Sequence, residues 1–109
     1  MVPAAPDAWI LALERYGTMS FGDVAGAAIR YAREGFTMHP VMAHYIAKNA
    51  DTYRRWPDNA AIFLPQGRPP REGELFVQAD LARSIQFMVD EERAASRGGR
   101  AAGLEAARN

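Results

Sequence analysis

The sequence contains no cysteine. A chain without thiols has no disulfide framework, no thiolate zinc site and no cysteine nucleophile, so these kinds of site are excluded. Carboxylates, imidazoles and hydroxyls are the groups left for chemistry. The lack of cysteine does not reveal the redox compartment.

The chain also lacks net charge, because 13 Lys and Arg residues offset 13 Asp and Glu residues. A neutral protein has no global field that would draw it to nucleic acid or to an anionic membrane. The acidic run Asp90–Glu92 is followed by an arginine-rich tail, residues 93–109. A solvated helix end explains this pattern better than an RNA-binding tail does, so we expect neither nucleic acid nor membrane as a partner.

Long apolar runs are missing too, and the first seven residues show no basic segment followed by an apolar stretch. The sequence as written therefore predicts a soluble chain without an export signal, and the localisation stays unknown. Apolar residues make up 49% of the 109 residues and charged residues 24%, a balance typical of a folded protein with at most one core.

Helical spacing of apolar residues predicts a mainly α fold of four to five helices. We expect the first helix to begin with Asp7 as its cap and to end at Gly17 in a left-handed conformation. Ser20 and Asp23 form a variant of the capping box and open a second helix, which Gly35 ends.

A third helix is expected from His39-Pro40 to Trp56-Pro57, with Trp56 closing over the core. Residues 57–77 are rich in proline and glycine, which predicts an extended connection. From Gln78 the helical period returns, and a stripe of apolar side chains is expected to face inward: Leu81, Ile85, Met88 and Val89. Residues 94–103 have little to bury and predict a linker, after which Leu104–Arg108 is too short to be stable alone.

Few residues offer catalytic or metal chemistry. His39 and His44 are five apart, roughly 140° around a helix, so surface or capping roles fit them better than a shared metal. The hydroxyls lack a strained nucleophile turn or a patterned base: Thr18, Ser20, Thr37, Thr52, Ser84 and Ser96. Gly98, Gly99 and Gly103 make only a weak phosphate cradle because no strand precedes them.

Arg54, Arg55 and Trp56, with Tyr53 beside them, have the residue types that stack on single-stranded bases. Arginines in the last turn of a helix also complement the helix dipole, which is the simpler interpretation. A nucleic-acid binder using these residues and the tail ranks last among three hypotheses.

Several short landmarks occur in a specific order: Val2-Pro3, Asp7-Ala8-Trp9, Leu13–Thr18, Ala27–Phe36, Ile62–Pro65, Gly67–Pro70, Gly73-Glu74 and Gln78–Arg83. Together they resemble the large-subunit region of γ-glutamyltransferases over residues 2–92. Residues 93–109 would then be an Ala/Arg/Gly-rich linker and a truncated helix. Ala4 and the glycine-rich insert at 98–103 depart from the family pattern, which suggests an amide substrate other than glutathione.

The resemblance implies an N-terminal-nucleophile hydrolase, made as a proenzyme, whose threonine attacks the γ-glutamyl amide of glutathione or a related compound. In that fold this region is a helical excursion around an αββα core. The partners implied are the remainder of the large subunit and the small subunit.

The family's catalytic apparatus does not carry over to this chain. No Thr-Thr or Thr-x-His pair is present, and the arginine that holds the substrate carboxylate belongs to a segment upstream of the match. Arg15, Arg30 and Arg33 are not substitutes for it. We therefore expect no catalytic, cofactor or metal site here, and the leading hypothesis is a fragment of such an enzyme, inactive alone. The alternative is a stand-alone helical protein-interaction module.

Overall fold

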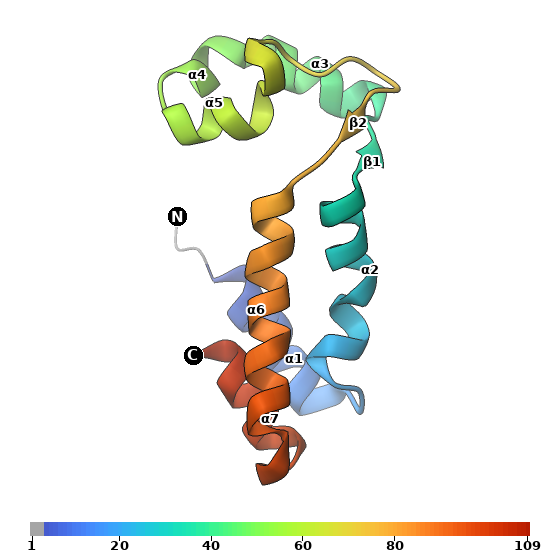
Figure 1. Ribbon diagram of the computed structural model, residues 1–109, viewed down its shortest axis with the longest axis vertical. Coiled ribbons are helices and arrows are strands. Elements are labelled where there is room, and N and C mark those ends of the chain that lie inside the picture. The colour runs from blue at the N-terminus through green and yellow to red at the C-terminus, as the bar shows by residue number, and fades with distance from the viewer. Residues whose placement is uncertain (1–3) are drawn as a thin grey trace. The chain divides into compact units, whose positions relative to one another are not determined.

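The computed structural model describes residues 4–109, so the Val2-Pro3 landmark lies outside the described residues. The described chain is mainly helical, as the sequence predicts, and it divides into two compact units (Figure 1). Unit 1 contains the residues up to Arg30 together with Ala79–Asn109, and unit 2 contains Tyr31–Gln78. No helix of the described residues is long and apolar enough to cross a membrane.

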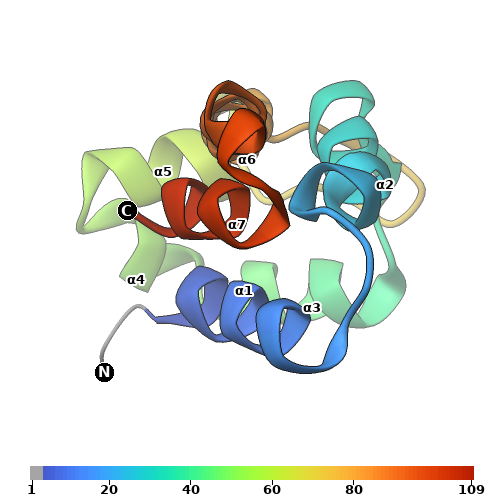
Figure 2. The ribbon, with the colours of Figure 1, turned by 90° about the horizontal axis from the view of Figure 1, so that it is seen from below.

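Unit 1 is built from helices at the two ends of the chain. They are α1 (Ala5–Tyr16), α2 (Phe21–Glu34, as far as Arg30), α6 (Ala79–Ala95), the 3₁₀ helix η2 (Ser96–Gly98) and α7 (Arg100–Arg108). Figure 2 shows α7 lying beside both α1 and α6, although α1 is distant from them in the sequence. Their shared core consists of Ile10, Phe21, Ala25, Ile29, Val89, Leu104 and Ala107.

Unit 2 consists of short elements. They are β1 (Phe36–Thr37), α3 (Pro40–Lys48), α4 (Ala50–Arg54), α5 (Pro57–Phe63), the 3₁₀ helix η1 (Pro65–Gly67) and β2 (Leu75–Phe76). The strands β1 and β2 pair antiparallel, with Phe36 opposite Phe76. The bonds Met38 N–H to Glu74 C=O (2.8 Å) and Gly73 N–H to Met38 C=O (3.0 Å) continue this pairing beyond the strands.

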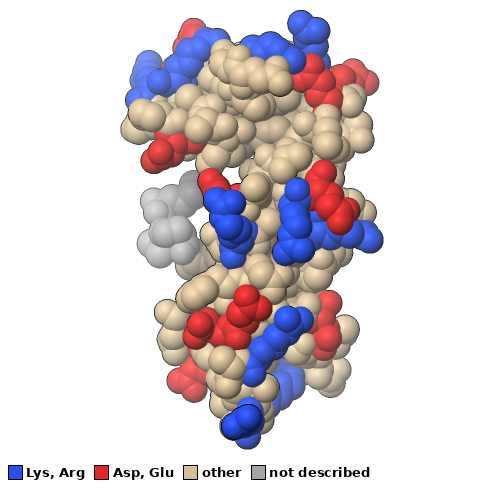
Figure 3. All heavy atoms as spheres, in the orientation of Figure 1, with Lys and Arg blue, Asp and Glu red and all other residues tan. Residues whose placement is uncertain are grey.

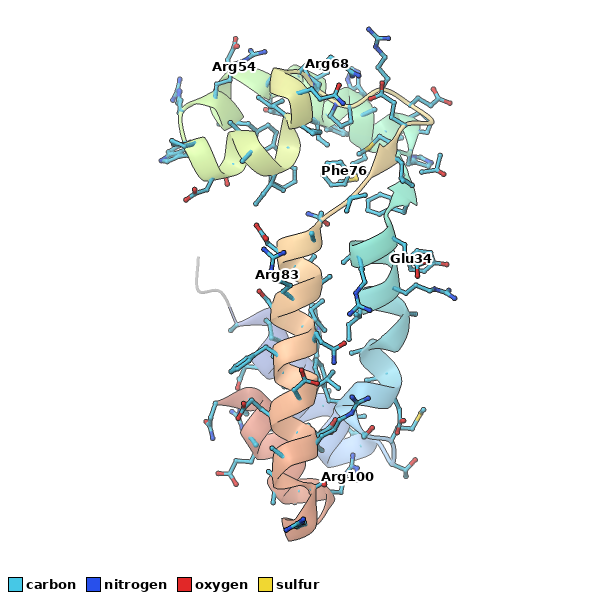
Figure 4. The ribbon with its side chains drawn as sticks, viewed as in Figure 1. Glu34, Arg54, Arg68, Phe76, Arg83 and Arg100 are labelled. Atoms are coloured by element: carbon cyan, nitrogen blue, oxygen red, sulfur yellow. The ribbon has the colours of Figure 1, made fainter. Side chains whose placement is uncertain are left out.

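An aromatic cluster fills unit 2. Phe76 is 1% exposed and lies edge-on to Phe36, with ring centroids 5.7 Å apart. Phe63 stacks with Phe76 (ring centroids 6.3 Å apart) and with Tyr53 (4.8 Å). Figure 4 shows Phe76 pointing from β2 toward the helices of its unit.

Two local predictions are confirmed. The capping box is reciprocal: the Ser20 N–H donates to Asp23 Oδ2 and the Asp23 N–H donates to Ser20 Oγ, each at 3.0 Å. Gly35 follows the last residue of α2 with φ +91°, a conformation that favours glycine. The positions at which α2 begins and ends are therefore indicated by neighbouring residues in the sequence.

The predicted ends of the first helix are wrong in detail. The helix begins at Ala5, with Pro6 in its first turn, where a proline removes no hydrogen bond, and Asp7 caps nothing. Asp7 pairs instead with Arg108 of α7. Gly17 does end α1, but its backbone is extended (φ −96°) and not left-handed. Glycine fits there because a Cβ would lie 2.5 Å from Leu13 Cδ1.

The helix count and the extended connection at 57–77 are corrected by the structure. The described residues form seven α-helices, since Asn49 divides the expected third helix into α3 and α4 and Pro57 starts α5. The proline and glycine content of residues 57–77 predicted an extended connection, but proline at a first helical position is compatible with a helix. Trp56 (54% exposed) and Leu81 (45%) were expected inside and lie outside.

The tail buries more than its composition indicates. Gly103 and Leu104 are buried, and α7 packs along α6 and α1. The prediction of a stretch with little to bury is therefore wrong at Gly103. Helix α7 is stabilised by tertiary packing and not by its own length.

Candidate functional site

Glu92 of α6 is the one buried charged side chain among the described residues, 7% exposed. Its Oε1 accepts from the Phe21 N–H at 2.7 Å, and its Oε2 accepts from the Gly22 N–H at 2.8 Å. These are the first N–H groups of α2, which have no partner inside their own helix. Glu92 therefore caps α2 across about 70 residues of sequence and complements the positive end of its dipole.

Two glycines make room for the Glu92 side chain. A Cβ on Gly22 would lie 3.4 Å from Glu92 Oε2 and 3.1 Å from Val89 Cγ1. A Cβ on Gly103 would lie 3.1 Å from both Glu92 Cγ and the Glu92 carbonyl oxygen. Gly103 thus serves close packing of α7 on α6, and not the phosphate cradle considered from the sequence. The charge pattern predicted a solvated helix end at Glu92, because the backbone groups that it binds lie on another helix.

A polar pocket of about 420 Å³ lies beside this junction, lined by Thr18, Ser20, Gly22, Asp23, Glu92, Arg93, Ser96, Gly99, Arg100 and Gly103. It brings together three of the hydroxyls considered as nucleophiles: Thr18, Ser20 and Ser96. Ser20 Oγ serves the capping box, and the Ser96 hydroxyl donates to the Arg93 carbonyl at 2.7 Å. No histidine is among the described lining residues, and the two carboxylates of the lining, Asp23 and Glu92, accept backbone N–H groups at the start of α2.

The charged groups around this pocket are held by the fold. The Ser20 hydrogen bonds lower the pKa of Asp23. Arg100 donates from Nη2 to the Leu13 carbonyl (2.6 Å) and from Nε to the Met19 carbonyl (3.1 Å), at the end of α1 and in the following loop. Figure 4 labels Arg100 where α7 begins. These groups act as helix caps, and the pocket is a structural junction.

Neither histidine belongs to a metal cluster. His39 caps α3, accepting the Val41 N–H at its Nδ1 (3.2 Å), and His44 is exposed with its ring edge-on to Tyr45 (5.6 Å). The sequence-based expectation of surface and capping roles is confirmed for both. Among residues 4–109 no three His, Cys, Asp or Glu side chains lie together as a metal site would require.

Two of the four residues considered for base stacking, Tyr53 and Arg54, are engaged in contacts within the fold. Tyr53 is half-buried and stacked on Phe63, so its faces serve the core of unit 2. Arg54 pairs with Asp51 at 2.7 Å. On the face shown in Figure 3, basic and acidic side chains are interspersed, which does not resemble the basic stripe of a nucleic-acid footprint.

A polar loop precedes β2, in the Gly67–Glu74 landmark region. Arg68 and Glu74 form a bidentate ion pair (Nη1 to Oε2 3.0 Å, Nη2 to Oε1 2.9 Å), and Glu74 Oε2 also accepts from the Arg71 N–H at 2.9 Å. These bonds, the Arg68 pair first, lower the pKa of Glu74 to about 2. The pair raises the pKa of Arg68 in turn. The landmark residues Arg68 and Glu74 thus hold the loop in one shape.

An apolar groove of about 530 Å³ lies between α1, α2 and α6 of unit 1. We call it the apolar groove; it is lined by Pro6, Trp9, Leu13, Phe21, Val24, Ala25, Ala28, Leu81, Ser84, Ile85 and Met88. Trp9, Val24 and Leu81 are exposed along it. A continuous apolar surface of this kind marks a place where something else binds or packs.

Comparison with known proteins gives a family-level match. The model of the gamma-glutamyltranspeptidase family matches residues 1–103. The chain is 37% identical over 99 residues to the acylase ACY 1 proenzyme of Pseudomonas sp. (strain SE83), a match that covers 91% of this chain and 18% of that protein. It is 35% identical over 94 residues to the glutathione hydrolase-like YwrD proenzyme of Bacillus subtilis (strain 168), covering 86% and 18%.

Solved structures agree with the sequence matches. The fold is similar to that of LmbA2991 with a TM-score of 0.80 and 34% identity, over 97% of this chain and 18% of that one. The chain therefore spans less than a fifth of the length of the proteins it matches here. The sequence did not predict the capping role of Glu92, nor the exposed positions of Trp9, Val24 and Leu81 along the apolar groove.

Proposed function

This chain belongs to the gamma-glutamyltranspeptidase family, and from that membership we propose that it is a helical part of a γ-glutamyltransferase-like acylase, inactive by itself. The observation that carries the proposal is the combination of near-complete coverage of this chain with 18% coverage of its relatives. A segment matched along its whole length to a small part of long proenzymes is best explained as a structural piece of such an enzyme.

The parent enzyme would hydrolyse or transfer an acyl group from an amide. The relatives' names include an acylase and a glutathione hydrolase-like protein. Family membership supports the γ-glutamyl group of glutathione or a related amide as the substrate class, with a threonine nucleophile whose own amine acts as base. Ala4 and the insert at 98–103 favour an amide other than glutathione.

Within the parent, residues 2–92 would form the helical excursion of the large subunit, packed on an αββα core, and α7 in residues 93–109 would stay packed on α6 and α1. The partners would be the remainder of the large subunit and the small subunit. This chain would supply no catalytic, cofactor or metal-binding residue. Three charged contacts support a scaffold role. Glu92 and Arg100 bind backbone groups of α2, α1 and the loop after α1, and the ion pair of Arg68 with Glu74 holds the loop before β2.

A direct test measures hydrolysis of γ-glutamyl-p-nitroanilide by the purified chain, with and without glycylglycine as acceptor. We expect no release of p-nitroaniline above a buffer blank. Turnover that co-purifies with the chain and disappears on heat unfolding would contradict the proposal. A purified family enzyme assayed in parallel controls for substrate quality.

A second candidate is a stand-alone helical interaction module. The observation that favours it is that each unit buries large side chains almost completely: Ile10, Val89 and Leu104 in unit 1, and Met38 and Phe76 in unit 2. Thermal unfolding followed by circular dichroism separates the two candidates. A broad loss of helix supports the enzyme-part proposal, whereas a sharp and reversible transition in a monodisperse monomer favours the module.

A further inference from the structure

The apolar groove of unit 1 leaves large apolar side chains exposed to solvent. We propose that it is the seat of an uncharged, aliphatic or aromatic segment of the parent enzyme, contributed by the part of the polypeptide that this chain does not cover. This proposal rests on the proposed function and names the surface through which the scaffold is held.

The chemistry of the lining defines what the occupant can be. Every described lining residue is uncharged, and Ser84 contributes the only hydroxyl. That hydroxyl donates to the Asp80 carbonyl one turn earlier, at 3.1 Å, so it is committed to its own helix. A charged or strongly polar occupant would lose hydration in the groove without gaining a partner. An anion, a cation or a charged peptide is therefore a poor fit.

The shape of the groove favours side chains entering from outside. Ala25 and Ala28 of α2 are small and leave space, while Trp9 on α1 and Leu81 on α6 provide larger apolar surfaces. Trp9, Val24 and Leu81 each remain about half exposed. Their burial by an apolar partner would be favourable in proportion to the area removed from water.

The comparisons indicate which partner this is. In LmbA2991 the same helical arrangement occurs with a TM-score of 0.80 as 18% of a longer chain. A segment of the same polypeptide is present at high effective concentration, whereas a second copy must be recruited from solution. The parent enzyme itself is thus the favoured occupant.

The natural chain has no cysteine, which permits a test with a single reporter thiol. Residues 4–109, which include the whole of α7 with the core residue Leu104, would replace the matching segment of the acylase ACY 1 proenzyme, carrying either Ala28→Cys or Ala27→Cys. Both alanines are exposed on α2, but only Ala28 lines the groove. Alkylation by N-ethylmaleimide is followed at each site by peptide mass spectrometry, in the isolated chain and in the chimera.

In the isolated chain we expect both thiols to react at similar rates. In the chimera the Ala28→Cys thiol should react at least about tenfold more slowly, because access then needs local opening, while the Ala27→Cys thiol changes less. Equal rates at the two sites in a folded chimera would overturn the proposal and leave the proposed function standing. Protection in the isolated chain that grows with concentration would assign the groove to a second copy, and would also overturn it. A chimera that does not fold would contradict the proposed function, and the groove proposal with it.

Discussion

The two units are stabilised by different kinds of contact. In unit 1, side chains bond to backbone groups far away in sequence: Glu92 to Phe21 and Gly22, and Arg100 to Leu13 and Met19. In unit 2, the bidentate pair of Arg68 and Glu74 joins residues six apart, and an aromatic cluster fills the interior. Polar caps on long helices thus characterise unit 1, and aromatic packing of short elements characterises unit 2.

This difference follows from element length. The helices α2 and α6 are 14 and 17 residues long, so their ends meet partners that lie far away in the sequence. The elements of unit 2 are between two and nine residues long and have few internal bonds, so burial of large rings must hold them. The substitutions below test whether unit 1 depends on its polar caps and unit 2 on its aromatic packing.

The largest effect is expected for Phe76→Ala in unit 2. Removing a ring that is 1% exposed leaves a cavity among Phe36 and Phe63, and we expect a loss of about 4 kcal/mol in the free energy of unfolding. Phe87→Ala is the matched control, because Phe87 is 64% exposed, and its effect should stay within about 0.5 kcal/mol. Urea unfolding measures both. Equal effects would refute the aromatic cluster as the support of unit 2.

Next comes Glu92→Ala in unit 1. The change leaves two N–H groups at the start of α2 without acceptors, and we expect a loss of about 3 kcal/mol. Glu91→Ala, one residue away and exposed, should change stability by less than about 0.5 kcal/mol. Amide hydrogen exchange should show faster exchange at Phe21 and Gly22 in the first variant. Unchanged exchange at these two amides would contradict the capping role.

Smaller effects, of opposite sign, are expected from a glycine-to-alanine substitution at two different positions. Gly103→Ala places a Cβ 3.1 Å from Glu92 Cγ and its carbonyl oxygen, so we expect a net loss of about 1 kcal/mol. Gly26→Ala meets nothing within 4 Å and should stabilise α2 by about 0.5–1 kcal/mol. Thermal unfolding compares the two. If Gly103→Ala also stabilised, the close packing of α7 on α6 would not depend on this glycine.

The smallest effect concerns pH. The pKa of Glu74 is lowered to about 2 by Arg68, so the contribution of the pair is fully present above the ordinary carboxyl pKa of 4.5 and is lost as the pH falls from there through about 2. Arg68→Gln should raise the pKa of Glu74 toward its ordinary value and so narrow this window from its lower end. NMR titration of the Glu74 carboxyl carbon measures both. A carboxyl that titrates near 4.5 in the unaltered chain would refute the pair.

Local signals could be predicted from the sequence and distant ones could not. The Ser20–Asp23 capping box and the stop at Gly35 depend on neighbouring residues, and both were predicted. The buried role of Glu92 depends on N–H groups about 70 residues away, which no local pattern encodes. Leu81 was predicted to be buried because it falls on the helical stripe of apolar residues. The stripe has the right period, but the Leu81 side chain is exposed and lines the apolar groove.

The short sheet of unit 2 has a consequence for how the family can vary. Because residues 36–38 are hydrogen-bonded to residues 73–76, the two ends of the segment 39–72 are held side by side. A segment closed in this way can be lengthened at its exposed turns while the sheet at its base stays in place, provided that its core residues, such as Ile46 and Leu64, are kept. Doubling the length of a flexible turn within it would cost only about 0.6 kcal/mol in closure entropy. This is where length differences between related chains should accumulate.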